Sequence, residues 1–60
     1  MSGIYKHKKT GNIYYLLLDD IIDATNAQDG QRMCLYVNQS NQLFVREYDE
    51  FFIKFEELKQ

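Results

Sequence analysis

Two single residues in the sequence have side chains that could act as a reactive centre. His7 is the only histidine, and its ordinary pKa lies close to neutral pH. General acid or base catalysis would need a nucleophile or a carboxylate beside it, but its neighbours in the sequence are lysines. We interpret His7 as a structural or surface residue.

The second is Cys34, the only cysteine, so the chain has no internal disulfide. A reactive thiolate needs a cationic partner in a partly exposed site, and Arg46 is the one candidate for that role. We interpret Cys34 as a packed residue of a strand. A lone cysteine, together with the lack of a signal peptide or a long apolar run, predicts a cytoplasmic protein.

Three carboxylates, Asp19, Asp20 and Asp23, raise the question of a metal site. They lack the spacing of a calcium loop, and two adjacent aspartates usually end a strand. A domain of 60 residues also has little room for a concave pocket that excludes water. We therefore expect no metal, no cofactor and no enzymatic activity.

A basic cluster near the N-terminus is the strongest electrostatic feature. It consists of Lys6, His7, Lys8 and Lys9, and Tyr5 precedes it. Cations beside aromatic rings are typical of grooves that hold single-stranded nucleic acids. The net charge of −2 and the pI near 5.1 argue against a general nucleic-acid binder, and lysines at a hairpin tip are ordinarily solvated.

The elements that position these residues centre on a hairpin over residues 31–48. Residues 38–42 supply the turn, with Asn41 in the left-handed conformation. Opposing residues then have numbers that sum to 80: Val37 with Leu43, Leu35 with Val45, Tyr36 with Phe44, and Cys34 with Arg46. We expect the first two pairs to point into the core and the other two to point outward.

The outward face of this hairpin would be rich in binding residues. Tyr36, Phe44 and Arg46, joined by Tyr48, are of the types enriched at protein interfaces. They predict a partner-binding surface. Under the alternative interpretation, the C-terminal segment folds over these side chains and makes them a second small core.

Other segments predict further strands. Residues 4–7 form a short one, followed by a turn in which Gly11 has a positive φ. Residues 13–18 are apolar on both faces, which indicates a strand covered on both sides. Residues 23–30 are loop by composition, and Asp29-Gly30 marks the turn into the hairpin.

The C-terminal residues are ambiguous. Some apolar residues recur at helical spacing, while Phe51, Ile53 and Phe55 alternate as in a strand. Our prediction is a tight turn over residues 48–51, a strand over residues 52–56 and then a loose or helical end.

Short motifs spread over nearly the whole chain. They are Tyr5-x-His7-x-Lys9 with Gly11 and Tyr14, then Cys34-Leu35-Tyr36, then Leu43-Phe44-Val45-Arg46, and then Glu50-Phe51-Phe52. Together they resemble a small bacterial family, the domain of unknown function 1653. Phe44 stands where that family has Trp, and Glu47 where it usually has Pro. The resemblance implies a compact SH3-like barrel and no known activity.

We therefore expect one mainly β domain over residues 1–60. Its five-stranded, strongly bent antiparallel sheet closes into an SH3-like barrel and ends in a short helical turn. The predicted function is a non-catalytic interaction module that docks a protein partner, such as a phage-encoded modulator or inhibitor of a host protein. Two alternatives stay open: a weak nucleic-acid-binding module, and a homodimer that meets through residues 13–18. No membrane association is expected.

Overall fold

The computed structural model describes residues 3–24 and 30–58. Over these residues the elements follow in the order β1 (Gly3–His7), β2 (Ile13–Asp23), β3 (Gln31–Asn38), β4 (Leu43–Glu47), α1 (Tyr48–Lys54) and β5 (Phe55–Glu57). The strands form one antiparallel sheet in the order β4-β3-β2-β1-β5. The prediction of a mainly β protein with a five-stranded antiparallel sheet is confirmed.

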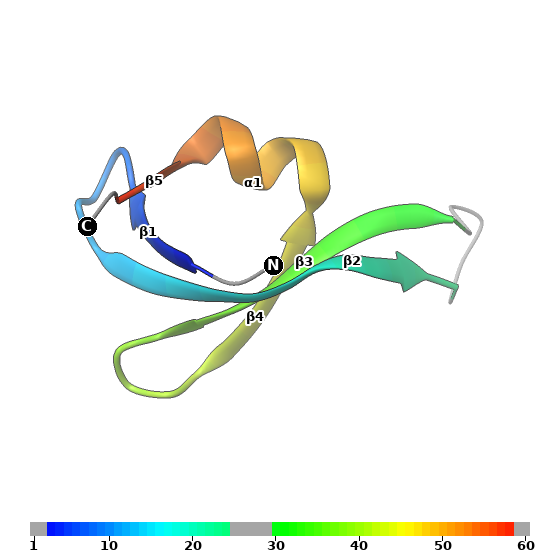
Figure 1. Ribbon diagram of the computed structural model, residues 1–60, viewed down its shortest axis with the longest axis horizontal. Helices are drawn as coiled ribbons and strands as arrows, with labels where there is room; N and C mark the ends of the chain where they lie inside the picture. The colour runs from blue at the N-terminus through cyan, green and yellow to red at the C-terminus, as the bar shows by residue number, and fades with distance from the viewer. Residues whose placement is uncertain (1–2, 25–29, 59–60) are drawn as a thin grey trace.

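The sheet is open within the described residues. Strands β4 and β5 each have one neighbour, so both are edge strands. Helix α1 connects these two edges in sequence, and it lies over one face of the curved sheet (Figure 1). We call the face under α1 the inner face and the opposite one the outer face.

The central hairpin has the predicted register. All the opposing pairs of β3 and β4 have numbers that sum to 80, from Met33 with Glu47 to Val37 with Leu43. Asn41 has a φ of 67°. The Asn38 side-chain oxygen accepts hydrogen bonds from the backbone N–H groups of Ser40 and Gln42, both at 2.9 Å. This Asx-type turn explains why a polar loop fixes one register.

Strand β2 is longer than predicted. The first turn is as expected, with Gly11 at a φ of 78°. The strand, however, continues past Asp19 and Asp20 to Asp23, with register shifts on either side of Leu18. Predicting that the aspartates end the strand was wrong, because Ile21 pairs with Met33 beyond them. Residues 25–29, in the predicted loop, lie outside the described residues.

Beyond the core, β2 and β3 extend as a two-stranded arm (Figure 1). The side chain of Asp20 at the start of this arm accepts a hydrogen bond from Nε of Arg32 at 3.0 Å. This ion pair joins the two strands where the register shifts.

The C-terminal segment is a helix followed by a short strand, so the predicted strand over residues 52–54 was wrong. Tyr48, Phe51, Phe52 and Phe55 are spaced so that a helical conformation puts all four rings on one side. A strand would separate Phe51 from Phe52 on opposite faces. Asp49 and Glu50 in the first turn and Lys54 in the last also favour the helix through its dipole.

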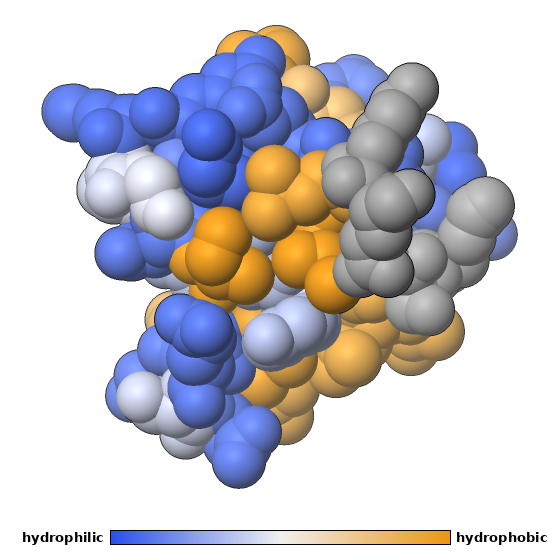
Figure 2. Space-filling model, turned by 60° about the vertical axis from the view of Figure 1, so that its left-hand side comes forward, coloured by the Kyte–Doolittle hydropathy of each residue, from blue (hydrophilic) through white to orange (hydrophobic). Residues whose placement is uncertain are grey.

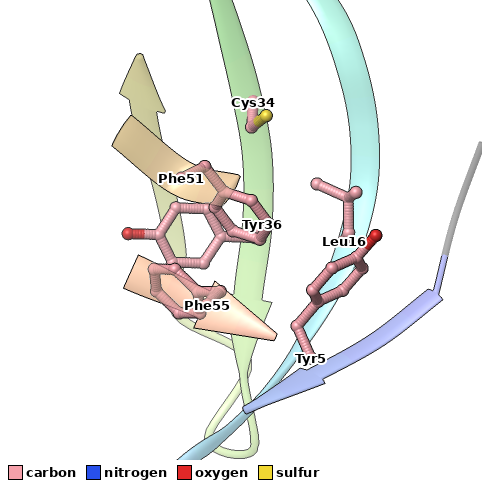
Figure 3. Close-up of a cluster of buried hydrophobic side chains, with 6 residues drawn as sticks. All are labelled: Tyr5, Leu16, Cys34, Tyr36, Phe51 and Phe55. Carbon is pink, nitrogen blue, oxygen red and sulfur yellow. The ribbon is translucent and has the colours of Figure 1, made fainter. Parts of the chain in front are cut away.

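The core lies between the inner face and α1 (Figure 3). Its buried side chains are those of Tyr5, Leu16, Cys34, Tyr36, Phe51 and Phe55. The expectation that Leu35, Val37, Leu43 and Val45 point inward together was wrong, since Leu43 and Val45 are 63% and 60% exposed. The alternative interpretation, in which the C-terminal segment folds over Tyr36, is confirmed.

Aromatic area explains this choice of face. Each aromatic ring buries about 150–250 Å², more than a valine or leucine. The rings of α1 and β5 can reach only the face that carries Tyr36, whose ring centroid lies 5.1 Å from that of Phe51 and 5.3 Å from that of Phe55. Packing four rings outweighs packing the smaller aliphatic side chains of the hairpin.

Candidate interaction surface

The outer face carries two rows of apolar side chains. The first row crosses four strands through paired residues: Ile4, Tyr15, Val37 and Leu43. The second crosses three strands and consists of Leu18, Leu35 and Val45. Because Val37 and Leu43 lie two residues from Leu35 and Val45 along their strands, the rows are adjacent on the same face. We call these seven residues the outer rows.

Much of this surface is open to solvent. Leu43, Val45 and Leu18 are exposed by more than half, and Tyr15 by 39%. No element of the described chain covers them, since α1 packs on the inner face through Phe51. Figure 2 shows hydrophobic surface from the centre of the view to its lower right, whereas the lower left is hydrophilic.

The outer rows contain no ionisable group other than the hydroxyl of Tyr15. Charged residues lie at the margin instead. Lys6 and Glu56, which face each other on β1 and β5, form an ion pair at 3.2 Å, and Glu47 stands at the end of β4. An uncharged apolar centre with a charged rim is the usual anatomy of a protein interface.

The outer face also has a shallow hollow of about 290 Å³. It is lined by Ile4, Tyr15 and Leu17, and also by Gly3 and Leu16, which pair with each other at the start of β1. The hollow lies at the β1 side of the sheet, whereas the most exposed side chains, Leu43 and Val45, lie at the β4 side. The hollow and the most exposed apolar side chains therefore lie on opposite sides of the face.

The predicted partner surface lies mainly on the inner face. Tyr36 is 4% exposed, so its ring cannot contact a partner without unfolding. Phe44 is partly exposed and stacks on Tyr36, with ring centroids 5.4 Å apart. Placing Tyr36 in an accessible surface was wrong, because the C-terminal rings bury it.

The other two members of that set have structural contacts. Arg46 donates from Nε to the Tyr36 hydroxyl at 3.2 Å and from Nη1 to a Glu50 carboxylate oxygen at 2.7 Å. The hydrogen bond with Tyr36, with a further one to Glu50, raises the pKa of Arg46 above its ordinary value. Tyr48 is half-buried, and the Arg32 guanidinium lies 4.0 Å from its ring centroid.

The structure divides the basic cluster. Tyr5 is in the core, and Lys6 faces outward toward Glu56. The remaining residues, His7, Lys8 and Lys9, surround a pocket of about 210 Å³ together with Ile53 and Lys54. Lys54 was missed by the sequence reasoning, and the hydrogen bond from the Lys8 backbone N–H to the Lys54 carbonyl oxygen, 2.9 Å long, explains its place there.

His7 itself has a structural environment. Its ring packs edge-on against Phe55, with centroids 4.9 Å apart. Its Nδ1 accepts a hydrogen bond from the Thr10 backbone N–H at 3.3 Å. Both contacts hold the β1–β2 turn in place.

Cys34 is fully buried. Burial raises the pKa of its thiol, and Asp19 raises it further. Arg46, opposite Cys34 in the sheet, directs its guanidinium to Tyr36 and Glu50 instead. The arrangement therefore disfavours the thiolate that a nucleophilic cysteine requires.

Among residues 3–24 and 30–58, no group of three or more histidine, cysteine, aspartate or glutamate side chains could hold a metal ion. Nor does the part of the chain that the structure describes contain a helix of the length and apolarity needed to span a membrane.

Comparison of the chain with protein-family models, with curated proteins and with solved structures found no match. The resemblance to the domain of unknown function 1653 therefore stays a prediction.

Proposed function

We propose that this protein is a small non-catalytic interaction module that binds a protein partner through the outer rows of its sheet. The observation that carries the proposal is the contiguous apolar surface over β1–β4 with Leu43 and Val45 as its most exposed members. A sheet that is apolar on one face normally packs that face against another layer. Here both faces are apolar, and α1 supplies a layer for one of them.

The size of the patch supports binding. Its exposed apolar area is on the order of 500 Å², within the range of about 300–600 Å² for the largest patch on a typical monomer, which is often functional. Isolated exposed leucines need no explanation, but a patch of this size, bordered by charges, favours a contact surface. We also propose that the fold is related to an SH3-like barrel. In this protein α1 would connect the edge strands β4 and β5, which do not pair with each other in the part of the chain that the structure describes.

A photo-crosslinking side chain tests the proposal. Val45→p-benzoylphenylalanine places the probe in the outer rows, and Ile53→p-benzoylphenylalanine places it on α1 at a residue that is 67% exposed. Illumination in an extract of the producing cell should give protein adducts at position 45 and few at position 53. Equal yields at both positions, or none at position 45, would contradict the proposal.

The basic cluster supports a second candidate function less well. Nucleic-acid binding through Tyr5 and Lys6 would need both side chains beside Lys8 and Lys9. One of them is buried, and the other forms an ion pair on the outer face. Three lysines and His7 remain around the small pocket. This number of cations could contact only a few phosphates of a nucleic-acid backbone.

A further inference from the structure

The hollow of the outer face and its most exposed apolar side chains lie on strands that a two-fold axis would exchange. We propose that the occupant of this face is another molecule of the same chain, so that two sheets pack face to face in a two-fold symmetric sandwich. This inference rests on the proposed function and names its partner. It is carried by the order of the strands, by the relief of the face, by its lack of charge and by its area.

The strand order gives the arrangement. A two-fold axis that runs parallel to the strands between β2 and β3 puts β4 of one copy over β1 of the other, and β3 over β2. An interface of this kind is isologous, so each contact occurs twice. The first outer row then lies over its own reversed copy, with Leu43 facing Ile4 and Val37 facing Tyr15.

The relief of the face fits this arrangement. Leu43 is the most exposed member of the outer rows and belongs to β4. The hollow of about 290 Å³ is lined by Ile4 and Tyr15 of β1 and β2. Strands β4 and β1 are three strand spacings apart, about 14 Å, so a side chain of one copy fills the hollow of the other without steric overlap at the axis.

The lack of charge on the outer rows favours a second copy over a strongly charged partner. Two copies that each carry a net charge of −2 repel weakly unless acidic groups meet. The outer rows place no carboxylate in the contact, and Lys6 and Glu56 already neutralise each other at the rim. An acidic or basic partner would find no charge to complement in the centre of the face.

The area indicates a weak dimer. Two copies would bury on the order of 1,000 Å² in total, at the lower limit for a specific interface. A chain of 60 residues buries only roughly 60% of its unfolded surface by folding alone, and oligomerisation is a common means of stabilising such domains. We expect a dissociation constant in the micromolar to millimolar range.

Sedimentation equilibrium of the full chain, from about 10 μM to about 1 mM, tests the proposal. The mean mass should lie close to that of one chain at the lowest concentration and rise toward that of two chains at the highest. Leu43→Lys should weaken association by about 100-fold, since one lost leucine contact with Ile4 of the other copy costs about tenfold and occurs twice. Ile53→Lys, on α1, is the matched control and should leave the association unchanged. Thermal unfolding at low concentration shows whether each variant is folded, and Leu43→Thr serves if the lysine variant is not.

A mixture of two variants tests the arrangement itself. Leu43→Lys and Ile4→Glu chains should each associate poorly alone but form a mixed dimer, because opposite charges then meet where β4 lies over β1. Failure of the mixture to associate would overturn this arrangement. A wild-type chain that stays monomeric to 1 mM, or an Ile53→Lys effect equal to that of Leu43→Lys, would overturn the dimer. Crosslinking of another protein at position 45 in the cell extract would then still support the proposed function, whereas its absence as well would remove both.

Discussion

The ring of Phe51 stacks on the ring of Phe55, with centroids 4.3 Å apart and planes 8° from parallel. This pair joins the middle of α1 to the start of β5, and both rings also pack against Tyr36 of the central strand. The stack therefore holds the helix on the inner face and decides which side of the hairpin is buried.

Removing the Phe51 ring should unfold the protein. Phe51 is fully buried, and a Phe→Ala change at such a site costs about 3–5 kcal/mol. A domain of this length has a total stability of only about 3–9 kcal/mol. Urea unfolding followed by circular dichroism should show Phe51→Ala largely or wholly unfolded in buffer. Ile53→Ala, two residues along on the exposed side of α1, should change the free energy of unfolding by no more than about 0.5 kcal/mol. Equal losses in the two variants would contradict this description of the core.

Removing the Tyr36 hydroxyl should cost stability without affecting binding. Tyr36→Phe deletes the acceptor of the hydrogen bond from Arg46, which is worth about 1 kcal/mol. Tyr15→Phe is the matched control, because it makes the same chemical change in the outer rows. We expect the first variant to lower the free energy of unfolding and the second to leave it nearly unchanged. A loss of partner binding in folded Tyr36→Phe would instead favour a binding role for the inner face.

Stability should fall as the pH rises into the alkaline range. Burial raises the pKa of Cys34 above its ordinary value of 9.0, and burial with nearby Glu57 raises that of Tyr5 above 10.0. The folded state then holds protons that the unfolded state releases, so stability is full below the unfolded pKa values and declines above them. Urea unfolding at a series of pH values should show this decline beginning near the ordinary thiol pKa. Cys34→Ala should weaken the first part of the decline, and an unchanged slope would contradict the role of the thiol.

The same thiol should be unreactive in the folded protein. Cys34 is buried and its pKa is raised, so both access and thiolate content are low. A disulfide reagent added at neutral pH should label the folded chain far more slowly than the chain in strong denaturant. Equal rates in the two conditions would show that the thiol is accessible and would reopen a redox role.

Any binding to single-stranded nucleic acid should be weak and should depend only modestly on salt. Three lysines around the small pocket could release about three counterions, so an affinity would fall by about 20-fold between 50 mM and 200 mM salt. A protein with a full binding groove loses about 10³–10⁵ over that range. Fluorescence anisotropy with a labelled oligonucleotide measures this, with Lys8→Gln as the variant. A loss of 10³ or more would indicate an extended nucleic-acid surface.

The sequence allowed the hairpin to be predicted in detail. Asn41 tolerates the left-handed conformation that the turn requires, and the side chain of Asn38 can bond the turn amides. These local effects set the register without help from the rest of the chain. The turn at Gly11 was predicted for the same reason.

The burial of the hairpin faces could not be predicted from that segment. Both sides are apolar, with Leu35 and Val45 on one and Tyr36 and Phe44 on the other. The choice depends on where Phe51 and Phe55 fall, and their segment was ambiguous because its strand and helix preferences oppose each other. Because residues 52–54 were predicted as strand and not as helix, the wrong face of the hairpin was predicted to be buried.

One available signal pointed to the candidate surface. Residues 13–18 are apolar on both faces, which favours cover on both sides, and among the described residues α1 covers only one of them. Tyr15 and Leu18 of that run lie in the outer rows. These apolar side chains are left partly exposed by the core. Apolar residues beyond those that the core buries favour a contact with another molecule.

Methyl-resolved NMR spectra of the wild-type chain at about 20 μM and about 1 mM provide the most direct test of the outer face as the surface through which two copies associate. The methyl signals of Leu35, Val37, Leu43 and Val45 should shift or broaden at high concentration, while those of Leu16 and Ile53 stay in place. Shifts confined to Ile53, or signals from the outer rows that do not change with concentration while those of other residues do, would contradict it.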